Sequence, residues 1–142
     1  MSELRYCPIK HRWTIIAPER KLRPGELGSH EEAGTTPAED DPFAPGNESQ
    51  TPPEIFRLPA GHEDWQVRVF ANSFPAIRVE GEVVREAVGL NDTVSGVGAH
   101  EVIVETPDSN RELADLDVEE ILLVLRAYRA RLLDLRRDPR LR

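Results

Sequence analysis

The sequence predicts an α+β fold in which short strands precede one long helix. Residues 65–70 alternate between apolar and polar side chains, which is the period of a half-buried strand. Residues 12–16 and 100–105 are rich in β-branched side chains, and each run stops shortly before a proline. After residue 117 the apolar residues recur at helical spacing instead. Much of the remaining chain, with its 12 prolines and 9 glycines, is expected to be loop.

The three strands differ in strength. The clearest is 65–70, in which Trp65, Val67 and Val69 are expected to face the core and the polar residues between them to face solvent. Between it and the strand at 100–105, residues 77–79 and 82–84 are expected to pair as a weaker hairpin. The segment 89–98 is rich in turn residues, so it is predicted to be loop.

A long loop is predicted over residues 26–54. This stretch contains no Lys or Arg and is dense in Gly, Pro, Ser, Thr and acidic residues. Such a segment has too little apolar surface to offset its ordering entropy. We expect the island at 42–48 to be its most ordered part.

The final element is predicted to be an amphipathic helix. Asp117 and Glu120 have the spacing of a capping box, and Pro139 ends the helical pattern. The apolar stripe requires a sheet to cover it, and few strands precede it, so the chain is expected to be an incomplete domain. The stripe consists of Val118, Ile121, Leu122, Leu125, Tyr128, Leu132 and Leu135.

Composition limits the classes of function. The formal charge of −8 argues against binding to a nucleic-acid backbone, which requires clustered cations. The single cysteine, Cys7, indicates a reducing compartment. We find neither a signal segment nor the roughly 20 apolar residues of a membrane helix. We therefore expect a cytoplasmic protein that binds neither nucleic acid nor membrane.

Three groups of residues could carry chemistry. Arg20, Lys21 and Arg23 form either a phosphate clamp or a solvated basic turn. The turn 72–75 offers an Asn that could read a base or ribose edge, or it simply ends a strand. His100 is either an acid–base group or a structural hydrogen-bonding residue. Neither a metal-ligand cluster nor a nucleophile constellation is visible in the sequence.

The order of motifs resembles the N-terminal part of the galactose-1-phosphate uridylyltransferase family. The resemblance covers essentially all of residues 1–142, and five motifs in the right order make it specific. These motifs are Arg12 to Arg20 followed by Arg23-Pro24, Pro42 to Glu48 followed by Thr51 to Glu54, Val67 to Pro75, Gly96 to Val102, and Leu113 to Leu116 with the closing helix.

This resemblance implies a histidine-triad (HIT-like) fold, an antiparallel sheet with packed helices. It implies transfer of a uridylyl group between UDP-glucose and galactose 1-phosphate through a nucleotidyl-histidine, with a homodimer in the full-length form. Closely related members act on ADP-glucose or as phosphorylases. The family's nucleotide and phosphate contacts match Arg20, Arg23, Phe43, Asn72, Ser73 and Phe74.

Two departures from the family pattern bear on activity. Many members bind a structural zinc, but the corresponding positions here read Asp41, Ala44 and Ser109, so no metal site is expected. The His-Pro-His nucleophile of relatives follows the closing helix, and no His follows His100 here. The chain alone is therefore expected to be the nucleotide-contact half of a nucleotidyltransferase, and to be inactive by itself because the nucleophile segment is absent. The alternatives are an inactive remnant, a nucleotide-binding module, or a fragment of an ADP-glucose phosphorylase.

Overall fold

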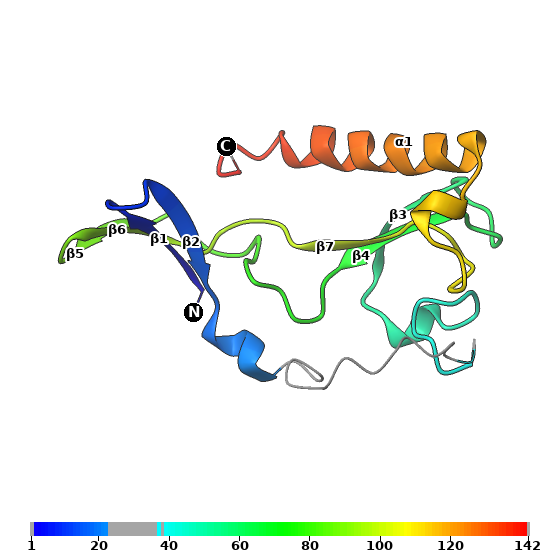
Figure 1. The fold of residues 1–142 in the computed structure, drawn as a ribbon, viewed down its shortest axis with the longest axis horizontal. Coiled ribbons are helices and arrows are strands. Elements are labelled where there is room, and N and C mark those ends of the chain that lie inside the picture. Colours follow the sequence, from blue (N-terminus) through cyan, green and yellow to red (C-terminus); the bar gives the residue numbers. More distant parts are fainter. Residues whose placement is uncertain (1, 23–36, 38, 142) are drawn as a thin grey trace. The chain divides into compact units, whose positions relative to one another are not determined.

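The computed structural model describes residues 2–22, 37 and 39–141, and within them the chain forms two compact units. One unit holds 2–22, 74–100 and 138–141. The other holds 37, 39–73 and 101–137. Each has its own antiparallel sheet, and the second also carries the long C-terminal helix (Figure 1). The predicted α+β class is confirmed.

The first unit is built on a four-stranded sheet in the order β2-β1-β6-β5. Its strands are β1 (Glu3–Cys7), β2 (Arg12–Ile16), β5 (Arg85–Val88) and β6 (Asn91–Ser95). The short 3-10 helix η1 (Pro18–Leu22) follows β2. The predicted strand at 12–16 is confirmed, whereas its partner β1 was not predicted.

The predicted hairpin at 77–79 and 82–84 is wrong. The hairpin of this region lies further on, where β5 pairs with β6 around Gly89, which has a φ of 63°. Residues 91–95, predicted as loop, therefore form a strand. Asn91, Asp92 and Ser95 obscured it because they are typical turn residues, while Val94 and Thr93 lie between them.

The second unit is built on a three-stranded sheet with β4 (Val67–Ala71) in the centre. β3 (Glu54–Leu58) and β7 (Glu101–Val104) flank it, and both pair with it in antiparallel register. The predicted strands at 65–70 and 100–105 correspond to β4 and β7. β3 begins at the last residue of the predicted 26–54 loop, and residues 23–36 and 38 of that loop lie outside the described residues.

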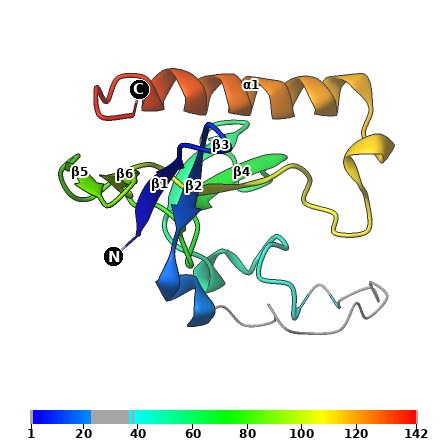
Figure 2. The same cartoon turned by 60° about the vertical axis from the view of Figure 1, so that its left-hand side comes forward.

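The sheet of the second unit is covered on both faces. Helix α1 (Val118–Leu135) lies along one face, and the segment 39–50, with the 3-10 helix η2 (Glu48–Gln50), lies along the other (Figures 1 and 2). All of Val67, Arg68, Val69 and Phe70 are consequently buried, whereas the sequence predicted that Arg68 would face solvent.

Helix α1 begins as predicted, but the face that packs on the sheet overlaps the predicted stripe only in part, at residues such as Tyr128. Asp117 accepts hydrogen bonds from the amides of Glu119 and Glu120, and the capping box is complete. The buried residues, however, are Val124 and Ala127, which pack with Val67 of β4. Leu125 and Leu132 of the predicted stripe are 55% and 62% exposed. In the part of the chain that the structure describes, no helix is long and apolar enough to cross a membrane.

Candidate functional site

The predicted contact residue Phe43 lies in a tight turn of the second unit. The amide of Phe43 donates to Oδ1 of Asp41 at 2.9 Å, and the amide of Ala44 donates to the Asp41 carbonyl at 3.1 Å. The side-chain amide of Asn47 donates to the same carbonyl at 2.7 Å. These bonds fold residues 41–47 back on themselves and present the Phe43 ring.

The Phe43 ring is stacked on the sheet. Its centroid lies 5.8 Å from that of Phe70 in β4, with 25° between the ring planes. The guanidinium carbon of Arg68 lies 4.9 Å from the Phe70 centroid, a cation–π distance. Phe43 is still 42% exposed, so it combines a fixed position with an accessible aromatic surface.

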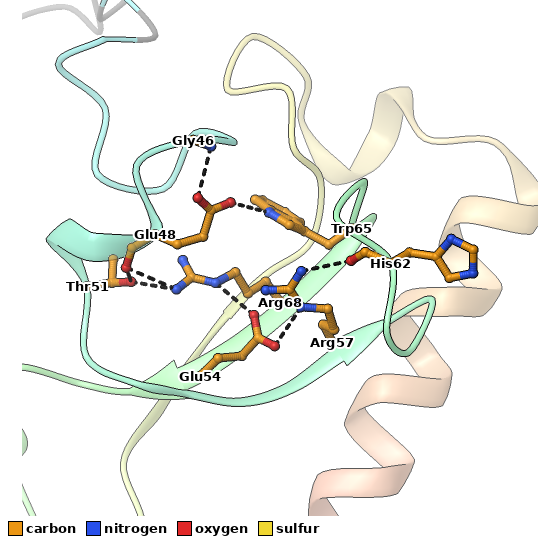
Figure 3. Close-up of polar contacts among 8 residues, drawn as sticks. All are labelled: Gly46, Glu48, Thr51, Glu54, Arg57, His62, Trp65 and Arg68. Atoms are coloured by element: carbon orange, nitrogen blue, oxygen red, sulfur yellow. Dashed lines mark hydrogen bonds and ion pairs between the residues drawn. The ribbon is translucent and has the colours of Figure 1, made fainter.

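Arg68 lies beneath this turn in a buried network of charges (Figure 3). Its side chain is 2% exposed, and Nε donates to Oε2 of Glu54 at 3.1 Å. Nη2 donates to Oγ1 of Thr51 at 2.8 Å and to the carbonyl of Glu48 at 3.4 Å. A buried cation of this kind requires a charged partner and further hydrogen bonds, and Glu54 and Thr51 supply them.

Glu48 forms the second part of the network. One carboxylate oxygen accepts the indole Nε1–H of the buried Trp65 at 2.8 Å, and the other accepts the amide of Gly46 at 3.0 Å (Figure 3). The hydrogen bond from Trp65 is the largest cause that lowers the pKa of Glu48, followed by backbone bonds and the charge of Arg68. The carboxylate is therefore held ionised.

Arg57 contacts the same network from β3. Its Nε donates to Oε1 of Glu54 at 2.6 Å and its Nη1 to the carbonyl of His62 at 2.8 Å. The hydrogen bond to Glu54 raises the pKa of Arg57. Glu54 thus bridges two arginines, of which only Arg68 reaches the segment that follows Phe43.

Asn72 and Ser73 follow β4 directly, at the end of the second unit. Asn72 is half-buried and Ser73 is exposed. Phe74 is the first residue of the 74–100 segment of the first unit, and it is 39% exposed. In that unit, Nδ1 of His100 accepts the amide of Ala76 at 3.0 Å, two residues after Phe74. This contact favours the structural interpretation of His100, because it fixes the chain immediately after the turn.

The basic cluster lies in the first unit. Arg20 is in η1, where its amide donates to the carbonyl of Ala17 at 3.1 Å. Arg23 lies outside the described residues. The five described contact residues therefore divide between the two units. Within the second unit, the Phe43 ring is stacked on Phe70 of β4, and Asn72 and Ser73 directly follow that strand.

The sequence did not predict a role at the site for several residues of this arrangement, among them Glu48, Arg68 and Phe70. Each of these three residues lies inside a motif on which the family resemblance rests, but the motif itself does not indicate what its side chain contacts. Arg68 could have been predicted from its place between the apolar residues of β4. A charged side chain that is buried in a strand requires partners that pair with its charge and accept its hydrogen bonds.

The zinc positions of the family do not fit a metal in this chain. Oδ1 of Asp41 is engaged by the Phe43 amide, and Ala44 is buried and has no donor atom. Ser109 is exposed in a different loop. Among residues 2–22, 37 and 39–141, no group of three or more His, Cys, Asp or Glu side chains could hold a metal ion.

The comparison with protein families decides the assignment. Residues 1–141 match the family described as galactose-1-phosphate uridyl transferase, N-terminal domain. The chain belongs to this family. Its antiparallel sheets and packed C-terminal helix are those of the HIT-like superfamily, as the resemblance implied.

Proteins from Arabidopsis thaliana that are similar to this chain illustrate the family. An ADP-glucose phosphorylase is 34% identical over 133 residues, which cover 92% of this chain and 38% of the relative. The crystal structure of an ADP-glucose phosphorylase with bound ADP-glucose matches with a TM-score of 0.58 and 28% identity, over 98% of this chain and 39% of that one. A GALT-like protein matches with a TM-score of 0.60 and 27% identity, over 96% and 37%. The chain thus spans well under half the length of these relatives.

Proposed function

We propose that this chain supplies the nucleotide-contact half of a hexose-1-phosphate uridylyltransferase. Such an enzyme moves a uridylyl group between UDP-glucose and galactose 1-phosphate. The observation that carries the proposal is the family match over residues 1–141. The exposed Phe43 ring on Phe70 supports it, because it is a preformed stacking surface for a base.

Each predicted contact residue has chemistry that suits part of a nucleotide sugar. Phe43 offers an aromatic face to the base, and Asn72 offers both a donor and an acceptor to the base or ribose. Arg20 and Arg23 supply guanidinium groups, whose fork of donors matches phosphate oxygens. Ser73 and Phe74 lie beside Asn72 and would complete this contact.

A second candidate is a fragment of an ADP-glucose phosphorylase. The 34% identity to a phosphorylase of that specificity favours it, as does the likeness to a structure with bound ADP-glucose. Both candidates place a nucleoside diphosphate sugar on the same residues, so the difference lies in the base and in the second substrate.

Calorimetric titration of the 142-residue chain separates these candidates. We expect saturable binding of UDP-glucose or ADP-glucose, with the other nucleotide sugar weaker, and no heat from glucose 1-phosphate alone. Phe43→Ala should weaken binding about tenfold, as loss of one stacked base costs about 1–3 kcal/mol. Ile55→Ala, an exposed apolar residue of β3, is the matched control. If a folded chain binds neither nucleotide sugar, the proposal is wrong.

A further inference from the structure

The segment that carries Phe43 is attached to the sheet mainly through two side chains. Glu48 accepts hydrogen bonds from Trp65 and from Gly46. Arg68 donates to Thr51 and to the Glu48 carbonyl. The contacts to Trp65 and to β4 therefore come from Glu48 in η2 and from Thr51 directly after it, and the Gly46 amide ties the residues before η2 to the same Glu48 carboxylate (Figure 3).

Burial of the Arg68 guanidinium carries a desolvation cost that packing alone does not explain. The guanidinium is 2% exposed, and its Nη1 is buried without a hydrogen-bond partner among the described residues. An apolar side chain of similar volume would fill such a site at lower desolvation cost. Unlike an apolar side chain, the Arg68 guanidinium donates hydrogen bonds to Glu54 of β3 and to Thr51 of the segment at the same time. It therefore links the segment to the sheet in one fixed arrangement.

The same side chain also lies under the aromatic stack. The guanidinium is 4.9 Å from the centroid of Phe70, on which Phe43 is stacked. Arg68 thus contacts Thr51 at the end of the segment 43–51, and it contacts Phe70, on which the ring at the start of the segment is stacked.

We infer that Glu48 and Arg68 are positioning residues for Phe43. They hold residues 43–51 against β4 so that the Phe43 ring keeps its place on Phe70 before any ligand arrives. The value of this order for binding rests on the proposed function, in which Phe43 stacks on the base. A preordered segment spares the ligand the cost of ordering it.

The test compares Glu48→Ala, Arg68→Met and Arg57→Met in the 142-residue chain. Arg57 is the matched control because it shares Glu54 with Arg68, whereas its hydrogen bonds within the described part of the chain go to Glu54 and His62 and not to residues 43–51. Arg68→Met keeps an apolar filling for the site. Should it fail to fold, Glu48→Ala still decides the question, because Glu48 is only partly buried.

Two measurements are made on each variant. Hydrogen exchange of the Ala44 backbone amide, which donates to the Asp41 carbonyl at 3.1 Å and does not contact Glu48, is followed by NMR and reports the order of the segment without any ligand. Titration with the nucleotide sugar that the parent chain binds reports the consequence for affinity. We expect exchange to accelerate at least about tenfold in Glu48→Ala, and affinity to fall about tenfold in Glu48→Ala and Arg68→Met, changes of roughly 1.4 kcal/mol each. Arg57→Met should change affinity less than about twofold.

The outcomes distinguish this inference from the proposed function. Unchanged exchange and affinity in folded Glu48→Ala and Arg68→Met would overturn the positioning role. Faster exchange with unchanged affinity would also overturn it, because the order would then serve stability alone. If the parent chain binds neither UDP-glucose nor ADP-glucose, the proposed function fails, and the exchange measurement still decides whether Glu48 orders the segment.

Discussion

Arg131 of α1 and Glu101 of β7 form an ion pair with two hydrogen bonds. Nε and Nη2 of Arg131 each donate to a different carboxylate oxygen at 2.8 Å, and the two side chains are 11% and 12% exposed. The planar fork of Arg allows this geometry in one orientation of the helix. The pair therefore helps to fix the face of α1 that lies on the sheet.

Loss of this pair should destabilise the second unit. Arg131→Met leaves the Glu101 carboxylate nearly buried without its partner, which costs about 3 kcal/mol. Arg137→Met is the matched control on the same helix, because its contact with Asp134 is 3.7 Å long and its side chain is 83% exposed. It should cost less than about 0.5 kcal/mol. Urea unfolding of both variants gives the comparison, and equal losses would contradict the assignment.

Tyr128 should make stability sensitive to alkaline pH. Its hydroxyl donates to Glu105, and this bond, with burial, raises the pKa of Tyr128 to about 12 from its ordinary value of 10.0. The folded chain holds the proton more tightly, so this contribution is complete below about pH 10 and is lost as the pH rises to about 12. Tyr128→Phe should remove this part of the decline. Thermal melts between these pH values measure it, and identical pH profiles would refute the assignment.

Glu120 should make the stability of the folded chain sensitive to acidic pH. Arg111 donates both Nη groups to its carboxylate at 2.7 Å, and with the Asp117 amide this lowers the pKa of Glu120 to about 2 from 4.5. A depressed pKa stabilises the folded chain above the ordinary value, and the contribution is lost as the pH falls towards 2. Glu120→Gln should flatten the acid limb of the stability curve. Glu119→Gln, in the same helical turn, should leave it unchanged, and a Glu120→Gln curve as steep as that of the parent would count against this role.

Arg20 provides a separate test of the phosphate contact. Arg20→Ala should weaken binding of a nucleoside diphosphate sugar about tenfold, as hydrogen bonds to charged groups contribute about 1.5–3 kcal/mol. The loss should shrink at high salt, because salt screens the attraction between a guanidinium and a phosphate. Arg129→Ala removes an exposed cation from α1 and controls for net charge. Equal affinities of the parent chain and Arg20→Ala would sink the clamp assignment.

Periodicity predicted much of the second unit and failed where polar groups are buried. The alternation at 65–70 located β4, but it placed Arg68 in solvent, because periodicity does not register the Glu54 and Thr51 partners that make a buried Arg tolerable. The same limit affected α1. Its sheet-facing side includes Arg131, whose charge is satisfied by Glu101, so the predicted apolar stripe coincides with the buried side only in part.

Local turn residues hid the strands of the first unit. Asn91, Asp92 and Ser95 are poor strand formers, yet β6 forms because it pairs with β1 on one side and β5 on the other. β3 was similarly hidden at the end of a loop-like segment. A strand that is stabilised by partners distant in the sequence cannot be recognised from the ten or so residues around it.

The candidate site residues were predicted from the family resemblance, which rests on the order of the motifs, and not from periodicity or composition. Phe43 came from the family resemblance, and its stack on Phe70 then gave it a structural basis. Glu48 and Arg68 were passed over because a carboxylate in a loop and an Arg in a strand are each common as solvated groups. Only their shared contacts around residues 46–51 distinguish them.

NMR mapping of a nucleotide sugar onto the isotope-labelled chain tests the central claim most directly. Addition of UDP-glucose or ADP-glucose should shift the amide signals of Phe43, Asn72 and Arg20 in a saturable way, while exposed positions of α1 such as Leu132 stay unchanged. A folded chain in which neither ligand shifts these three signals, or in which the shifts fall only elsewhere, would contradict the account.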